Sequence, residues 1–212
     1  MNHTYKGIIF DLDGVLCHTD HYHYLAWKRL AERLNIPFSE QDNNRLRGVS
    51  RMESLEIILE KSEKKYSREE KQAFAEEKNA EYRNLLQQMK PEDISKEVRE
   101  TLDCLKKKLK LAVGSSSKNT QLILEKTDMK KYFDAIADGN DIRNSKPDPE
   151  VFLLAADRIQ LTPEECLVVE DAKAGVEAAI RGGFECAGIG DAAQDESVTI
   201  ALKSFDDLQQ LA

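Results

Sequence analysis

The stretch IIFDLDGVL, residues 8–16, runs three large apolar residues directly into two aspartates and a glycine. A short apolar run of this kind is typical of a buried strand. Ligands of open α/β sheets bind at the carboxyl ends of the strands, where Asp11 and Asp13 stand. Asp and Gly also favour plain turns, and D-x-D-G resembles half of a calcium loop, although Tyr22 stands where an EF-hand needs glutamate. Taken alone, the stretch is consistent with either a functional site or a polar turn.

Other apolar runs predict the remaining strands of a sheet. They are Leu109–Gly114, Leu167–Val169, Glu185–Ile189 and, more weakly, Ala135–Ala137. Helical patterns lie between these later runs. Strands that alternate with helices indicate βαβ units and a parallel sheet, so the sequence predicts an α/β fold.

The interval between the first two strands is too long for a single crossover and is helical throughout. Ser50 with Glu53, and Ser67 with Glu70, have the spacing of helix N-terminal capping boxes. Residues 17–90 are therefore predicted to form a helical module inserted after the first strand.

Composition limits the class of protein. The chain has 212 residues, 41% of them hydrophobic, and a formal net charge of -8. A negative chain does not suggest a general nucleic-acid binder, and no stretch approaches 18 consecutive apolar residues. The scattered cysteines form no C-x-x-C pair and are expected to be reduced. We expect a cytoplasmic protein that binds neither nucleic acid nor membrane.

Two further stretches contain residues suited to binding phosphate. In LAVGSSSKN, residues 111–119, a strand runs into serines and a lysine before a helix, which predicts either a phosphate cradle or an ordinary Ser-capped helix. In NSKPDPE, residues 144–150, Lys146 precedes a proline that restricts its backbone. A loop lysine by itself is usually just solvated.

A second strand also ends in acidic residues. CLVVED, residues 166–171, places Glu170 and Asp171 at the same predicted sheet edge as the first two aspartates. An acidic helix N-terminus would be the plain explanation. Four gathered carboxylates repel one another unless a cation lies among them, and oxygen ligands favour Mg²⁺. With the hydroxyls and the lysine, these are the parts of a phosphoryl-transfer site in which Asp11 is the nucleophile.

The order of these four motifs resembles the haloacid dehalogenase superfamily over essentially the whole chain. The resemblance implies a doubly wound Rossmann-like parallel sheet core, residues 1–16 and 91–212, with an inserted α-helical cap domain, residues 17–90. It implies that Asp11 attacks phosphate and Asp13 is the general acid and base. The implied Mg²⁺ ligands are Asp11, the backbone carbonyl of Asp13, Glu170 and Asp171. The implied phosphate-binding residues are Ser115 and Lys146, with Ser117 and Lys118 nearby.

Within the predicted cap, LRGVSR (residues 46–51) resembles the β-phosphoglucomutase family. The candidate substrate residues are His23, Arg47, Gly48, Val49, Ser50, Arg51, Lys78 and Asn79. The resemblance implies that Arg51 binds the distal phosphate, and Ser50 as N-cap would place Arg51 beside exposed helix amides. Lys78 lies on an otherwise apolar helix stripe, so it either extends along the edge of that stripe to water or is aimed at the substrate.

This second resemblance implies the interconversion of β-glucose 1-phosphate and glucose 6-phosphate through an aspartyl phosphate and a bisphosphate. A Mg²⁺-dependent sugar-phosphate phosphatase shares every core residue and remains an alternative. A phospho-accepting receiver domain is a third possibility, although such domains lack a long insert after the first strand. The expected partner is a small sugar phosphate, and we expect a monomer.

Overall fold

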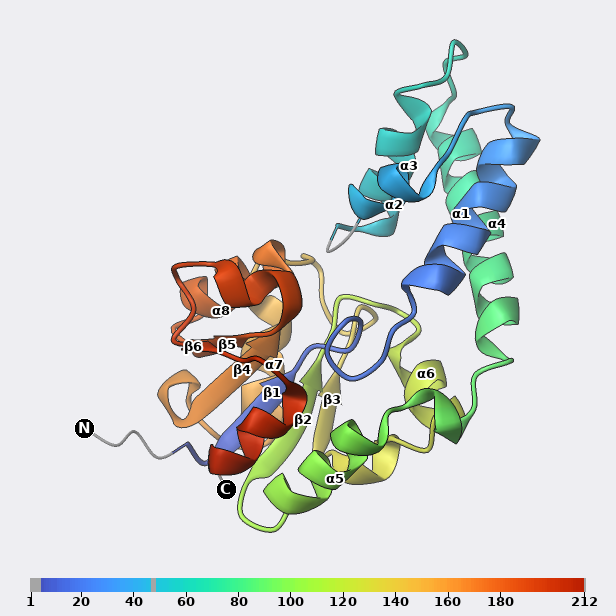
Figure 1. Ribbon diagram of the computed structural model, residues 1–212. Helices are drawn as coiled ribbons and strands as arrows, with labels where there is room; N and C mark the ends of the chain where they lie inside the picture. Colours follow the sequence, from blue (N-terminus) through green and yellow to red (C-terminus); the bar gives the residue numbers. More distant parts are fainter. Residues whose placement is uncertain (1–4, 47–48, 212) are drawn as a thin grey trace. The chain divides into compact units, whose positions relative to one another are not determined.

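The computed structural model describes residues 5–46 and 49–211 and contains a six-stranded sheet in the order β3-β2-β1-β4-β5-β6 (Figure 1). The strands are β1 (Gly7–Phe10), β2 (Lys110–Gly114), β3 (Ala135–Ala137), β4 (Cys166–Glu170), β5 (Glu185–Gly188) and β6 (Ile200–Ala201). Every neighbouring pair is parallel. The predicted α/β class is confirmed, and β1 lies between β2 and β4, so the three polar strand ends are adjacent.

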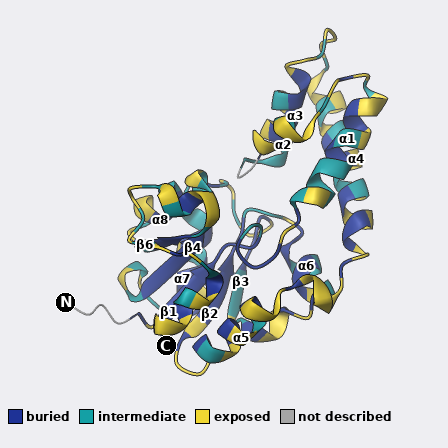
Figure 2. Cartoon of the chain, in the orientation of Figure 1, coloured by how far each residue is buried: buried dark blue, intermediate teal, exposed yellow. Residues whose placement is uncertain are grey.

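Helices cover both faces of this sheet, as a doubly wound fold requires. They are α5 (Lys96–Leu105), α6 (Thr120–Lys126), α7 (Glu150–Arg158) and α8 (Lys173–Arg181). One face packs Ile9 and Val168 against Phe152 of α7 and Val176 of α8. On the other face, the Phe10 ring lies against the rings of Phe133 and Phe205. The central strands β1 and β4 are accordingly buried along their whole length (Figure 2).

The helical residues after β1 form a unit with its own core. It contains α1 (Asp20–Arg33), α2 (Glu40–Asn44), α3 (Arg51–Leu59) and α4 (Arg68–Leu86). Trp27, Leu30 and Leu55 are among the buried residues of its core. The bidentate Arg33–Glu77 pair, with both contacts at 2.7 Å, joins α1 to α4. The α4 N-terminus carries the predicted capping box of Ser67 and Glu70.

The chain divides into two compact units, and several small elements were not expected, among them β6, α2 and the short 3-10 helices. One unit comprises the described residues of Met1–His18 and Lys90–Ala212, and the other is Thr19–Met89. The edge strand β6 has two residues and α2 has five, too few for a hydrophobic period to be visible in the sequence. Among the described residues, no helix combines the length and apolarity that a membrane span needs.

Candidate active site

The carboxyl end of β1 places Asp11 at the centre of a buried polar cluster. The Asp11 amide donates to the Val169 carbonyl at 3.0 Å, which continues the β1–β4 ladder by one residue. Gly14 then turns the chain with a φ of 87°, and a Cβ there would lie 2.0 Å from Asp171 Oδ2. Glycine is needed here both for the left-handed backbone and for the close approach of the Asp171 carboxylate.

Lys146 is the cation of this cluster. Its Nζ lies 2.5 Å from Asp11 Oδ1 and 2.5 Å from Glu170 Oε1, and it stands 4.5 Å from the centre of the Phe152 ring. Burial alone would lower the pKa of the Lys146 ammonium, but the carboxylates of Asp11 and Glu170 outweigh burial and raise it above its ordinary value. Lys146 is therefore a permanent positive charge that partly neutralises the acidic residues around it.

Glu170 is the most deeply buried of these carboxylates. Burial raises the pKa of Glu170 to about 7, the Lys146 charge opposes that rise, and the Asp11 charge adds to it. Its Oε2 accepts from the amides of Asp171 at 3.1 Å and Ala172 at 3.2 Å. A Cβ on Gly175 would lie 1.9 Å from this carboxylate, so α8 comes close to Glu170 only because residue 175 has no side chain.

The acidic residues fit a hard divalent cation. Asp11, Glu170 and Asp171 each offer a carboxylate oxygen, and these oxygens lie within 4.8 Å of one another. An all-oxygen ligand set favours Mg²⁺ over softer metals. Asp13 is half-buried in the turn that follows. Its predicted metal ligand is the backbone carbonyl, so the grouping of side-chain oxygens does not include Asp13.

The serine loop after β2 lies at the same edge of the sheet. Ser115 is buried, and its Oγ accepts from the Ser117 amide at 3.2 Å. Ser117 Oγ in turn accepts from the Asn119 amide at 3.2 Å, so these hydroxyls order the turn into α6. The Lys118 side chain is exposed, while its carbonyl accepts from the Asn140 side chain at 3.0 Å. Of the predicted phosphate-binding residues, the serines and Lys118 thus share one loop, and Lys146 comes from another.

In the helical unit, His23 and Lys78 come together. Lys78 is 3% exposed, its Nζ lies 2.8 Å from His23 Nδ1, and it stands 4.6 Å from the ring centres of both Trp27 and Tyr82. Burial lowers the pKa of His23 well below its ordinary value, and the positive charges of Lys78 and Arg51 lower it further. His23 is therefore a neutral imidazole whose Nδ1 accepts a hydrogen bond from the Lys78 ammonium. Lys78 therefore does not extend along the edge of the apolar stripe to water, which was one of the two alternatives for this residue.

The segment before α3 supplies the other predicted cap residues. The Ser50 hydroxyl accepts from the Glu53 amide at 3.3 Å, which makes Ser50 the N-cap and Arg51 the first helical residue, as predicted. Burial lowers the pKa of the half-buried Arg51 guanidinium, and the Glu76 carboxylate opposes this effect. Val49 and Asn79 are half-buried. The predicted residues Arg47 and Gly48 lie outside the described residues.

Three residues that contact the cluster or its loops were missed in the sequence. Ser116 accepts from the Lys146 amide at 3.2 Å, Glu150 accepts from two amides of the loop that carries Lys146, and Gly175 makes room for Glu170. A glycine inside a helical pattern costs about 1 kcal/mol relative to alanine, so Gly175 could have indicated a packing reason at that position. Nothing in the local sequence identifies the partners of Ser116 and Glu150.

Comparison of the sequence and the structure with known proteins identifies the family of the chain. The family model described as haloacid dehalogenase-like hydrolase matches residues 5–183, so the chain belongs to the haloacid dehalogenase-like hydrolase family. A β-phosphoglucomutase from Bacillus subtilis is 39% identical over 96% of this chain and 91% of its own length. A phosphorylated carbohydrates phosphatase from Thermotoga maritima is 38% identical over 85% and 82%. The crystal structure of a β-phosphoglucomutase from Clostridium difficile is 37% identical, with a TM-score of 0.89 over 97% of this chain and 93% of that one.

Proposed function

We propose that this protein is a β-phosphoglucomutase, with Asp11 as the phosphorylated nucleophile. Phosphorylated Asp11 transfers its phosphoryl group to the 6-hydroxyl of β-glucose 1-phosphate, while Asp13 removes the hydroxyl proton. The product is the 1,6-bisphosphate. Its 1-phosphoryl group then returns to the Asp11 carboxylate, and Asp13 gives its proton to the departing C1 oxygen, which leaves glucose 6-phosphate.

The core residues have separate roles in this scheme. Lys146, with the Ser115 hydroxyl and the Ser117–Lys118 loop, binds the transferring phosphoryl group. Asp11, Glu170 and Asp171, with the Asp13 carbonyl, would hold Mg²⁺, which when bound neutralises charge on that group. These assignments are supported by the position of Lys146 between two carboxylates and by the grouping of carboxylate oxygens.

The observation that favours a mutase over a phosphatase is the positive charge in the helical unit. Lys78 is hydrogen-bonded to His23, and the charges of Lys78 and Arg51 both lower the pKa of His23, so this unit holds two cations close to one residue. A mutase must bind a second phosphate at the far end of its bisphosphate, whereas a monophosphatase needs no cation for it. The relative from Bacillus subtilis supports this choice.

A sugar-phosphate phosphatase is the second candidate, and the relative from Thermotoga maritima favours it. It would use the same core residues, with water in place of the sugar hydroxyl as the acceptor. The two candidates therefore differ in the helical unit and in the fate of the aspartyl phosphate.

Arg51→Ala tests the distinction. We expect this variant to lose mutase turnover by about 10- to 150-fold, because one charge-assisted phosphate contact contributes about 1.5–3 kcal/mol. Hydrolysis of a small aryl phosphate, which has no second phosphate, should change by less than about twofold. Arg45→Ala is the matched control, because Arg45 is an exposed arginine of the same unit paired with Glu60. Equal loss of both activities in Arg51→Ala would argue against a distal-phosphate role.

A further inference from the structure

Lys146 lies in the loop between β3 and α7, and its ammonium must reach two carboxylates at once. A lysine side chain is flexible and carries about 2 kcal/mol of rotamer entropy, so its head group is placed well only when its backbone is held. The residue that follows is Pro147, which has no N–H. The Lys146 amide is therefore a key backbone donor for a hydrogen bond that holds this part of the loop to the rest of the unit.

Ser116 accepts that donor. Its Oγ lies 3.2 Å from the Lys146 amide nitrogen, although the two residues are 30 positions apart in the sequence. Ser116 stands between Ser115 and Ser117 in the loop after β2. One hydroxyl thus connects the predicted phosphate cradle to the loop that carries the lysine, and it fixes the backbone of Lys146 relative to that cradle.

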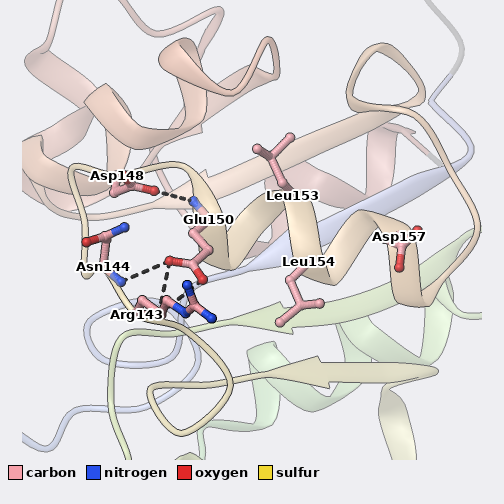
Figure 3. A pocket seen from close by; sticks show the side chains of 7 residues that line it. All are labelled: Arg143, Asn144, Asp148, Glu150, Leu153, Leu154 and Asp157. Carbon is pink, nitrogen blue, oxygen red and sulfur yellow. Dashed lines mark hydrogen bonds between the residues drawn. The ribbon is translucent and has the colours of Figure 1, made fainter.

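Glu150 holds the same loop a few residues earlier (Figure 3). Its two carboxylate oxygens accept from the Arg143 amide at 3.1 and 3.0 Å, and Oε2 accepts from the Asn144 amide at 2.9 Å. The amides of Asn144 and Arg143 hold the pKa of Glu150 below its ordinary value. Its own amide donates to Asp148 Oδ1 at 3.0 Å, which ties the first turn of α7 to the end of the loop. Hydrogen bonds to a carboxylate are stronger than neutral ones, so Glu150 is an effective anchor.

We propose that Ser116 and Glu150 are positioning residues that hold loop 143–146 from two sides, so that Lys146 presents its ammonium to the transferring phosphate. The inference rests on the proposed role of Lys146 in binding phosphate. Neither side chain needs to touch the substrate, because each acts through the backbone of the loop. The plain alternative is that both residues stabilise the fold without affecting Lys146.

A double-mutant cycle separates these two roles. The binding of inorganic phosphate to the Mg²⁺-supplemented full chain would be measured by calorimetry. Ser116→Ala and Glu150→Gln are each expected to weaken phosphate binding about fivefold, the worth of roughly one hydrogen bond. Ser116→Thr keeps the hydroxyl and should restore binding. In a Lys146→Ala background, neither further substitution should change the affinity by more than about twofold.

Asp157→Asn is the matched control for Glu150→Gln. It removes the same charge from an exposed position of the same helix, away from the amides that Glu150 holds (Figure 3). The control should bind phosphate as the wild type does. Thermal unfolding of every variant identifies any that fail to fold, and the Ser116→Thr variant then remains informative.

The possible results are distinct. Unchanged phosphate affinity in Ser116→Ala and Glu150→Gln would overturn the proposal, and so would equal losses with and without Lys146. If Lys146→Ala itself binds phosphate like the wild type, the assigned role of Lys146 fails, and the positioning role fails with it. Because the assay uses phosphate binding, it does not depend on whether the enzyme is a mutase or a phosphatase.

Discussion

Substituting Gly175 of α8 by alanine tests the arrangement of the acidic cluster, because Gly175 lies against the Glu170 carboxylate. The new Cβ would lie 1.9 Å from Glu170 Oε1, and real Cβ atoms essentially never approach another heavy atom within 3.0 Å. The Glu170 carboxylate must therefore move by about 1 Å or α8 must shift outward. Either change disturbs the 2.5 Å contact with Lys146 and the grouping of oxygens within 4.8 Å.

The expected effect is on metal binding more than on folding. Loss of a well-placed partner at a metal site weakens metal affinity by about 10- to 100-fold. Helix propensity acts in the other direction, because alanine inside a helix is more stable than glycine by about 1 kcal/mol. We therefore expect the Gly175→Ala variant to unfold within a few degrees of the wild type and to bind Mg²⁺ 10- to 100-fold more weakly.

Calorimetric titration with Mg²⁺ measures this directly. Glu177→Ala is the control, since Glu177 lies on the same helix and pairs with Arg181 at the surface. The control should bind Mg²⁺ as the wild type does. Wild-type Mg²⁺ affinity in a folded Gly175→Ala variant would refute the assignment of Glu170 as a ligand.

Three further predictions concern Asp11, His23 and the metal. Asp11→Asn should abolish both mutase and hydrolytic turnover while the fold is kept; residual turnover above about 1% of wild type would contradict a nucleophilic role. Because the pKa of His23 is lowered in the folded state, the unfolded chain binds more protons, so stability falls with decreasing pH below about 6.5, by up to about 1.4 kcal/mol per pH unit. Urea unfolding at several pH values should show that slope reduced in His23→Gln; an identical slope would show that His23 is not its source. Mg²⁺ at about 100 times the wild-type Kd should raise the free energy of unfolding of the wild type by about 2.7 kcal/mol. The same Mg²⁺ concentration should stabilise Asp171→Asn by less, and an equal gain in the two proteins would remove Asp171 from the ligand set.

The central strands and their polar ends could be predicted from the sequence because burial on both faces leaves a continuous apolar run. β1 and β4 are such runs, and each ends at the acidic residues of the cluster. The grouping of Asp11, Glu170 and Asp171 follows from the rule that parallel strands end at the same edge. The insert could be predicted because its length and its capping residues are local features of the chain.

The contacts made by single polar side chains could not be predicted in the same way. The position of Lys78 on an apolar stripe was visible, but its placement against His23 and two aromatic rings depends on how α1 packs on α4. Ser116 and Glu150 act on loop amides whose positions are set by tertiary structure, and hydrophobic periodicity does not report such pairings.

The most direct test of the proposed function is a single assay on the wild-type protein. β-Glucose 1-phosphate would be supplied with Mg²⁺ and a trace of the 1,6-bisphosphate, glucose 6-phosphate would be followed with a coupled dehydrogenase, and free phosphate would be measured in parallel. The proposed mutase predicts that glucose 6-phosphate accumulates well ahead of free phosphate. Release of phosphate without formation of glucose 6-phosphate would contradict it and establish the phosphatase instead.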